Sequence, residues 1–419
     1  MYKRQLAKAE ADVISNAIKA IDAIGKVTAD SKDKIQNAKD AYSAVPERLR
    51  DKVTNSDTLD KATERFAVID TIKQAGTKSE EHFDTVLGTL ADNNIYPVQS
   101  IGGEWSVIAL ARAGKLSADK AAKYYSELCE AVKANGSDRL SDRKPTENAR
   151  VIIALSSLGK NSADIAGYNL LSGLDDMDYI TSQGINAVIF SLIAFDTTDY
   201  SAKTHDELIT YIVDNMTGKG WALAGNTADV DLTAMAIQAL APYAADEKVN
   251  AAIDSGLEFL AESLDENARY ANGSESTSQV LIALAALGID PLTDSRFIVD
   301  GITLIDALES YATENGYSHT LGGEENYMAT EQAALALTAY ELSKDGSSLY
   351  EMSAKAEPTE PENPDTPAQP GDSVKPGDCS GKPEDKNDPI NPGTGVLVTG
   401  GMAVLISGAV MLISKKKRK

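Results

Sequence analysis

Two aspartates, Asp229 and Asp231, stand one residue apart just before the alanine-rich run AMAIQALAPY (234–243). Carboxylates at this spacing have three distinct uses. A buried aspartate can hold a proton and donate it to a substrate, and a rim of carboxylates can accept hydrogen bonds from a ligand. An aspartate can also cap a helix by accepting its free N–H groups. The sequence leaves binding and capping open, and the two are compatible.

Polar side chains recur at the corresponding place before other apolar runs. Six runs share one pattern: VIALARAG (107–114), VIIALSSLG (151–159), AVIFSLIAF (187–195), AMAIQALAPY, QVLIALAALG (279–288) and QAALALTAY (332–340). When the runs are aligned on a shared leucine, the position six residues earlier holds Glu104, Ala149, Asn186, Ala234, Ser278 and Glu331. We therefore expect a polar rim at the N-terminal ends of several helices, walled by four aromatic residues, Trp105, Trp221, Tyr317 and Tyr327.

The six runs indicate an internal repeat, with one helical pair per repeat. Each run is apolar on nearly every face and should be buried. The helices expected between the runs, such as SADKAAKYYSELCEAVKA, are amphipathic and can show one face to water. Six buried helices inside six exposed helices predict an all-α fold, an α6/α6 barrel over residues 80–346.

Glycine–aromatic pairs precede two of the runs, at 220–221 and 316–317, and a Gly-Glu-Trp triplet (103–105) precedes the first. Together with the repeated runs, these pairs make residues 80–346 resemble the prenyltransferase and squalene-cyclase repeat superfamily. The resemblance covers roughly two thirds of the chain. It implies an α/α toroid, and it says more about the fold than about an activity.

Two enzymatic activities of that superfamily need residues that this sequence lacks. Class II terpene cyclases use an Asp-x-Asp-Asp motif, and here Leu232 stands in place of one carboxylate. Protein prenyltransferases hold zinc with an Asp, a Cys and a His, and no cysteine accompanies a histidine at the expected barrel mouth. We therefore predict no catalytic residue, no metal and no cofactor. A cyclase-like or prenyltransferase-like enzyme is the alternative hypothesis.

The string DVDLTAMAIQALAPY (229–243) is more similar to the helical domain of the intrinsic factor and transcobalamin group and its bacterial surface homologues. This resemblance implies a corrinoid as one ligand to consider, although no β domain follows the sixth run to complete such a site. A rim of carboxylates suits a ligand that offers hydrogen-bond donors or positive charge. The predicted ligand-binding residues are Glu104, Trp105, Asn186, Trp221, Asp229, Asp231, Tyr317, Tyr327 and Glu331.

Residues 1–75 carry three apolar stripes at helical spacing, which start at Val13, Ile35 and Leu59. The third stripe extends to Ile69. The pattern predicts a small three-helix bundle that resembles the helical spacer repeats of bacterial surface proteins, with a structural role. The first residues lack the apolar segment of a signal peptide, so we expect that further sequence precedes them.

The segment 347–390 is rich in proline and acidic residues, which predicts a disordered stalk. In residues 391–419, a Pro-x-Thr-Gly motif, the apolar run 396–414 and five basic residues follow in order. A transmembrane helix needs about 20 apolar residues, and basic residues stay on the cytoplasmic side. This order resembles the LPXTG-like cell-wall sorting signal of Gram-positive surface proteins. The resemblance implies that a sortase cuts between Thr394 and Gly395 and joins Thr394 to peptidoglycan, whereas a plain membrane anchor is the alternative.

The formal net charge of −23 over 419 residues disfavours nucleic acid and anionic membrane surfaces as partners. Two cysteines, Cys129 and Cys379, are too few for a disulfide framework and are expected to be unpaired thiols. The sequence as a whole predicts a protein anchored to the surface of a Gram-positive cell. Its toroid is expected to bind an extracellular small molecule, glycan or protein, and a purely structural or adhesive surface module is the third hypothesis.

Overall fold

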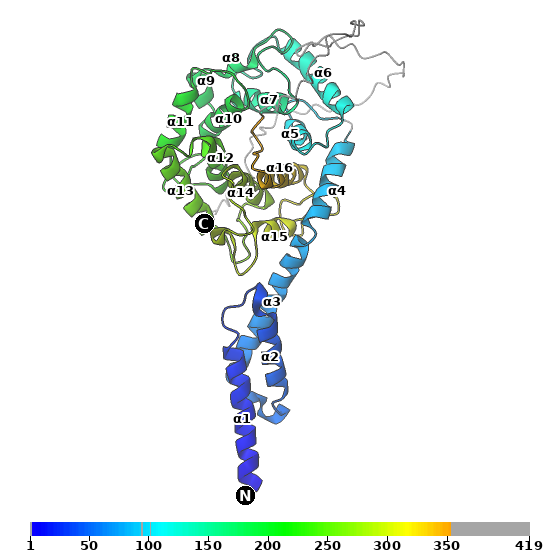
Figure 1. Ribbon diagram of the computed structural model, residues 1–419, viewed down its shortest axis with the longest axis vertical. Coiled ribbons are helices and arrows are strands. Elements are labelled where there is room, and N and C mark those ends of the chain that lie inside the picture. The colour runs from blue at the N-terminus through cyan, green and yellow to red at the C-terminus, as the bar shows by residue number, and fades with distance from the viewer. Residues whose placement is uncertain (1, 94, 101, 353–419) are drawn as a thin grey trace, which may run out of the picture. The chain divides into compact units, whose positions relative to one another are not determined.

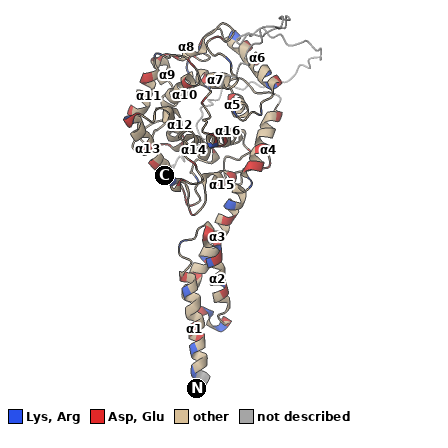
Figure 2. Cartoon of the chain, viewed as in Figure 1, with Lys and Arg blue, Asp and Glu red and all other residues tan. Residues whose placement is uncertain are grey.

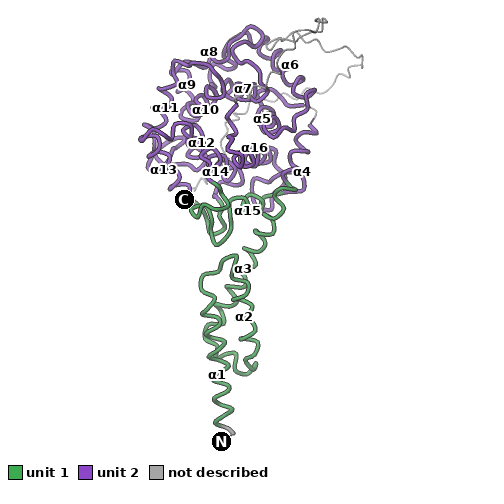
Figure 3. The backbone as a smooth tube through the Cα atoms, viewed as in Figure 1, with its two compact units in different colours: residues 1–82, 264–269, 290–312 green, residues 83–263, 270–289, 313–419 purple. Residues whose placement is uncertain are grey.

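The computed structural model describes residues 2–93, 95–100 and 102–352. These residues form helices and connecting loops, with isolated β-bridges and no β-strand among them. The predicted all-α class is therefore confirmed for this part of the chain. The chain divides into two compact units (Figure 3).

The first unit contains residues 1–82, 264–269 and 290–312. Its helices are α1 (Tyr2–Asp22), α2 (Lys32–Ser43), α3 (Ser56–Gly76) and α15 (Leu304–Glu309). Helices α1, α2 and α3 pack around one apolar core, which includes Ile21, Ile35 and Leu59. The three helices that the apolar stripes predict in residues 1–75 are all present.

The last turns of α3 leave that core and join a second one. Helix α3 is longer than α2, so its C-terminal turns extend beyond the bundle. There Ile69 and Ile72 are buried against residues of distant segments, Ala268, Ile302 and Ala307. Ile69 was expected in the three-helix core and instead belongs to this second core. The segments that supply its partners were expected within the toroid and are grouped with the first unit.

The second unit contains a ring of six buried helices that correspond to the six apolar runs (Figure 1). Each of these inner helices packs against the next, and the last packs against the first, so that the ring closes. The inner helices are α5 (Glu104–Arg112), α7 (Pro145–Ser157), α10 (Ile185–Asp196), α12 (Val230–Leu240), α14 (Ser274–Ala286) and α16 (Tyr327–Lys344). Nearly every residue of α10 and α14 is buried, as expected for runs that are apolar on all faces.

Other helices of this unit lie outside the ring (Figure 1). They are α6 (Ala118–Asn135), α8 (Leu170–Leu174), α9 (Met177–Thr181), α11 (His205–Asp214) and α13 (Glu247–Glu262). Helix α4 (Ser79–Asp92) spans the boundary between the two units.

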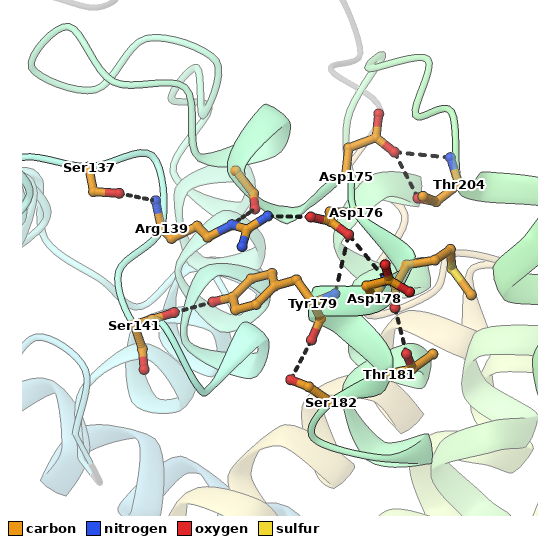
Figure 4. A network of polar contacts seen from close by, with 12 residues as sticks. Ser137, Arg139, Ser141, Asp175, Asp176, Asp178, Tyr179, Thr181, Ser182 and Thr204 are labelled. Carbon is orange, nitrogen blue, oxygen red and sulfur yellow. Dashed lines mark hydrogen bonds and ion pairs between the residues drawn. The ribbon is translucent and has the colours of Figure 1, made fainter.

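Between α7 and α10 the sequence predicted one amphipathic helix, and the structure has two short helices instead. After α8 ends, Asp176 starts a new helix as the N-cap of α9, because its side chain accepts from the N–H groups of Asp178 and Tyr179. Figure 4 shows the contacts that hold this turn, with Arg139 Nη2 2.7 Å from Asp176 Oδ2. The Arg139 guanidinium also lies 4.0 Å from the centre of the Tyr179 ring. These contacts fix a loop where a continuous outer helix was expected.

The predictions for the C-terminus fall outside the described residues. They are most of the predicted stalk at 347–390 and the sorting signal at 391–419, including Thr394 and Gly395. The first stalk residues, 347–352, are described and pack against the fold, with Leu349 buried and the Ser348 carbonyl bonded to Arg112, so the predicted stalk starts too early. Within the part of the chain that the structure describes, no helix is both long and apolar enough to cross a membrane.

Candidate functional site

The glycine–aromatic pairs are clamps at the start of two inner helices. The backbone N–H of Trp221 donates to Oγ1 of Thr233 at 3.0 Å, and Tyr317 makes the same bond to Thr330 at 3.0 Å. A Cβ atom on Gly220 would lie 2.3 Å from the Thr233 Oγ1 atom, so this close approach requires glycine. Both aromatic rings are fully buried. Trp221 and Tyr317 are thus packed inside the fold at the start of their helices.

Asp229 and Asp231 have different surroundings. Asp229 is the N-cap of α12, and its side chain accepts from the N–H of Leu232 at 3.0 Å. The equivalent residue before α16 is Asn326, which accepts from the N–H of Ala329 at 3.0 Å. Asp231 lies inside the first turn of α12 and is only 4% exposed. Helix capping therefore accounts for Asp229 and leaves Asp231 without that explanation.

Asp231 is buried against α14. The Ser276 hydroxyl donates to its Oδ1 atom, whereas its Oδ2 atom has no hydrogen-bond partner among the described residues. Burial raises the pKa of Asp231 to about 7; the bond from Ser276 opposes this rise, and the Asp229 and Glu275 carboxylates add to it. Asp231 can therefore hold a proton near neutral pH.

Glu104 forms a buried ion pair between α5 and α7. Its Oε2 atom lies 2.9 Å from Nε of Arg150, and Arg150 Nη2 lies 2.8 Å from Oε2 of Glu147. Burial alone would lower the pKa of Arg150, but the Glu104 and Glu147 carboxylates raise it. Removal of Glu104 or Arg150 would leave an uncompensated buried charge. The ion pair therefore holds the neighbouring inner helices α5 and α7 together.

Glu331 joins α16 to the start of α5. Its Oε2 atom accepts from the N–H of Gly102 at 2.9 Å and from the Ser106 hydroxyl at 3.2 Å. Its Oε1 atom has no hydrogen-bond partner in the described part of the chain. Burial raises the pKa of Glu331 to about 8, although these two hydrogen bonds oppose the rise. Glu331 is thus a second acid that can hold a proton near neutral pH.

The remaining predicted residues are also mostly interior. Trp105 is 4% exposed, and its ring centre lies 5.5 Å from that of Phe190. Asn186 is buried, whereas Tyr327 is 42% exposed and accepts a hydrogen bond from Asn93. The predicted rim is therefore a buried polar layer rather than an open mouth. A ligand-binding role for its nine residues stays a prediction.

The periodicity of the α-helix relates the residues of this layer to residues at the opposite ends of the same helices. Residues seven apart lie on one face of an α-helix. Gln238 comes seven residues after Asp231 on α12, and Ile193 comes seven residues after Asn186 on α10. Gln238 and Ile193 both line a cavity. The faces that carry predicted polar residues at one end thus carry cavity residues at the other.

Three buried glutamines join α12, α14 and α16 next to this cavity. Nε2 of Gln238 donates to the backbone oxygen of Gln279 at 3.0 Å and to its Oε1 atom at 2.9 Å. Nε2 of Gln279 in turn donates to Oε1 of Gln332. Because buried amides are costly unless they are paired, this glutamine chain fixes the spacing of the three helices.

The cavity lies at the C-terminal ends of α10, α12, α14 and α16 and has a volume of ≈ 510 Å³. Small-molecule sites in proteins have volumes of roughly 300–1,000 Å³. Apolar and polar groups both line it, among them Ile193, Asp196, Gln238, Ala239, Tyr243 and Ala285. The segment that follows α16, orange in Figure 1, supplies a further wall with Gly346, Ser347, Ser348, Tyr350 and Glu351.

Asp196, His205 and Tyr243 form a hydrogen-bonded triangle at this cavity. The Tyr243 hydroxyl lies 2.6 Å from Asp196 Oδ1 and 2.9 Å from His205 Nε2, and that nitrogen lies 2.9 Å from Asp196 Oδ1. Burial raises the pKa of Asp196, although the bonds from Tyr243 and His205 oppose the rise. Burial, the hydrogen bond with Asp196 and its negative charge raise the pKa of Tyr243 above its usual range. Asp196 and Tyr243 both face the cavity, so it has a fixed polar end.

This end of the helices was not predicted from the sequence. The polar residues of the predicted rim all precede the apolar runs, and the histidines were weighed only as zinc ligands. A signal was present, because Asp196 directly follows the run AVIFSLIAF and Tyr243 ends the run AMAIQALAPY. Examination of both ends of each run would have found these two residues.

Within the residues that the structure describes, no group of three or more His, Cys, Asp or Glu side chains is placed to hold a metal ion. Cys129 lies on the outer helix α6 and is disulfide-bonded. This corrects the expectation of two unpaired thiols. Cys379 lies beyond the described residues.

Comparison with models of protein families, with curated proteins and with solved structures gives no match to this chain. A function for this chain is therefore inferred from the geometry of the cavity and from the sequence patterns.

Proposed function

We propose that this chain is a binding protein on the surface of a Gram-positive cell. Its ring of inner helices is proposed to be an α6/α6 toroid of the prenyltransferase and squalene-cyclase kind. The closed cycle of helix contacts and the two equivalent glycine–aromatic clamps support this fold. The toroid binds a small extracellular molecule in the cavity at the C-terminal ends of the inner helices.

The cavity is the single observation that carries the binding function. A purely structural or adhesive toroid needs no cavity of ≈ 510 Å³ at the ends of its helices. Cores are otherwise packed to a high density, and voids weaken the fold. Convergent polar groups on an apolar lining are the usual composition of a ligand site.

The resemblance of residues 391–419 to a sorting signal supports the proposed location. We expect a sortase to cleave between Thr394 and Gly395 and to link Thr394 to peptidoglycan, with residues 396–414 as the membrane span before cleavage. Muramidase digestion of a sortase-competent host should release a product linked through Thr394. Extraction of the intact chain by detergent alone would instead indicate a plain membrane anchor.

A proton-donating enzyme of the cyclase kind is a second candidate, and one observation favours it. Asp231 has a pKa of about 7 and an oxygen without a hydrogen-bond partner among the described residues, which are properties of a catalytic acid. The binding function predicts that the full chain does not cyclise squalene-like polyenes. If the chain does cyclise such a polyene and Asp231→Asn abolishes the reaction, catalysis would replace binding as the proposed function.

A cavity-filling variant tests the binding function. Ala286 lines the cavity and is half-buried, so Ala286→Phe should occupy part of its volume. The matched control is Ala261→Phe on α13, which is also half-buried but does not line the cavity. The full chain is screened by ligand-observed NMR against corrinoids, wall-glycan fragments and small organic molecules. We expect at least one ligand whose binding Ala286→Phe abolishes and Ala261→Phe leaves intact, and absence of any such ligand would make the toroid a structural module.

A further inference from the structure

The charges around the cavity are predominantly negative. Asp196 and Glu351 line it, and no lysine, arginine or histidine of the described residues does. Two basic groups lie just behind the lining. His205 contacts Asp196. Arg112 Nη2 donates to the Ser348 carbonyl at 2.8 Å. Burial lowers the pKa of Arg112, and the nearby Glu351 carboxylate opposes this effect.

A third carboxylate, Asp206, has its Oδ1 atom 3.5 Å from His205 Nδ1, but its side chain is fully exposed, so solvent screens its charge. The acidic side chains of α11 and α13 stand on the adjoining outer helices of the same unit (Figure 2). Asp196 and Glu351 line the cavity itself, whereas the Arg112 guanidinium lies behind the lining, so the lining carries net negative charge.

Helix orientation adds to this charge. The lining residues on α10, α12, α14 and α16 all belong to the last turns of those helices. A helix C-terminus carries a partial negative charge from its free carbonyl groups, and this favours a cation nearby. Four helix ends converge on one cavity, so carboxylates and backbone dipoles act in the same direction.

Two tyrosine rings complete the lining. Tyr243 and Tyr350 are both half-buried and both border the cavity. Aromatic faces attract ammonium groups, most strongly where water is excluded. Ile193, Ala239 and Ala285 offer an apolar surface beside them, where the hydrocarbon part of a ligand would be removed from water.

We propose that this cavity binds a small organic cation, an amine or quaternary ammonium group on an apolar body, held by Asp196 and the rings of Tyr243 and Tyr350. This inference rests on the proposed binding function and names the chemical class of its ligand. An anion, such as a phosphate or a carboxylate, is disfavoured because no basic side chain of the described residues lines the cavity and four helix C-termini face it.

Three probes of similar shape and different charge test the inference on the full chain. They are phenyltrimethylammonium, its neutral carbon isostere tert-butylbenzene, and the anion benzenesulfonate. We expect saturable binding of the cation in ligand-observed NMR, about tenfold weaker binding of the neutral isostere and no binding of the anion. Equal or stronger binding of the neutral or anionic probe would overturn the inference about charge.

Variants locate the binding. Asp196→Asn keeps the shape of the side chain and should weaken binding of the cation about tenfold, with no change for tert-butylbenzene. The control Asp214→Asn changes an exposed carboxylate outside the lining and should have no effect. If Asp196→Asn lowers the melting temperature strongly, Glu351→Gln on the exposed wall replaces it and should weaken cation binding severalfold. A cation affinity that ignores Asp196→Asn and Glu351→Gln would contradict the inference.

The same experiment separates the two proposals. If the neutral or anionic probe binds and Ala286→Phe abolishes its binding, the cavity is a ligand site of another chemical class, so the binding function stands and the cation inference fails. If no probe of any charge binds and the broad screen is also empty, the binding function fails together with the inference.

Discussion

The two ends of the inner helices are built in opposite ways. At the N-terminal ends, polar groups are buried and joined across helices, as in the pair of Glu104 with Arg150 and the bond from Ser276 to Asp231. At the C-terminal ends of four of them, polar groups border a cavity of ≈ 510 Å³. One end holds the helices in place, and the other leaves room for a molecule.

The difference shows how one type of residue changes its use with its surroundings. An aspartate at the N-terminal end is favoured by the helix dipole, and the fold uses Asp229 there as a cap. Asp196 stands at the opposite end of α10, where the dipole disfavours a negative charge. A residue kept at an electrostatic cost is a better sign of function than one that its helix already stabilises.

The largest expected effect concerns pH at the buried end. The pKa of Asp231 rises from 3.8 to about 7 and that of Glu331 from 4.5 to about 8. Between about pH 4 and pH 8 the folded chain therefore holds protons that the unfolded chain has released, so stability falls as pH rises. A pKa difference of one between the folded and unfolded chains corresponds to about 1.4 kcal/mol, which gives a cost of the order of 4 kcal/mol for Asp231 above pH 7.

Melting temperatures at pH 5 and pH 8.5 should show this loss of stability, and the double variant Asp231→Asn with Glu331→Gln should reduce the dependence of the melting temperature on pH. An unchanged slope in the double variant would show that these acids are not the source.

A clamp glycine gives the next largest effect. Gly220→Ala places a Cβ atom against the Oγ1 atom of Thr233 and should destabilise the fold by about 1–3 kcal/mol, as expected for overpacking. Gly88 is the matched control, because it lies exposed in α4 with no atom near its would-be Cβ. Gly88→Ala should stabilise the chain by about 0.5–1 kcal/mol. Thermal unfolding of both variants gives the comparison, and equal melting temperatures would mean that the clamp does not constrain the fold.

The glutamine chain lies between the two ends and should show a smaller effect. Gln279→Met keeps the approximate volume but removes an amide that bonds to both Gln238 and Gln332. Leaving two buried amides with fewer partners should cost about 1–2 kcal/mol. Gln332 stands at the end of the chain of amides, so Gln332→Met should cost less in the same urea titration. A larger loss for Gln332→Met would contradict this order.

The smallest effect separates capping from binding at Asp229. Asp229→Ala removes the acceptor for the Leu232 N–H group and should cost about 1 kcal/mol, whereas Asp229→Asn should cost almost nothing because asparagine caps equally well. Neither variant should change the affinity of a ligand in the cavity. A loss of affinity with Asp229→Asn would instead return the binding site to the N-terminal end.

The helices could be predicted because their signal is periodic and local. Every apolar run is found as an inner helix, and the stripes at Ile35 and Leu59 mark helices of the first unit. The outer layer was less predictable between α7 and α10, where Asp176 caps a new helix and Arg139 holds the turn from a distant loop. Propensity along the segment contains no information about such a partner.

The cavity could not be predicted because it is made by segments that meet only in the folded chain. Tyr350 lies more than a hundred residues from Gln238 in the sequence, yet its hydroxyl is 3.5 Å from the Gln238 Oε1 atom. The clamps, in contrast, have a local sequence signature, of which only the glycine–aromatic pair was recognised from the sequence. In both, a Gly-aromatic pair is followed by an Asp or Asn cap and, four residues after the cap, by a threonine, as in Asp229 with Thr233 and Asn326 with Thr330.

The contacts between α16 and the start of α5 should form late in folding. Glu331 bonds to Gly102 and Ser106 across 229 and 225 residues of sequence. Contacts at such separation form late, since the entropic cost of closing so long a loop precedes any gain from the contact. During synthesis α5 leaves the ribosome long before α16 exists, so the face of α5 that packs against α16 stays exposed to solvent until α16 has been made. The protein should therefore depend on rapid docking of α16, or on chaperones that cover this face, to avoid aggregation while it is being made.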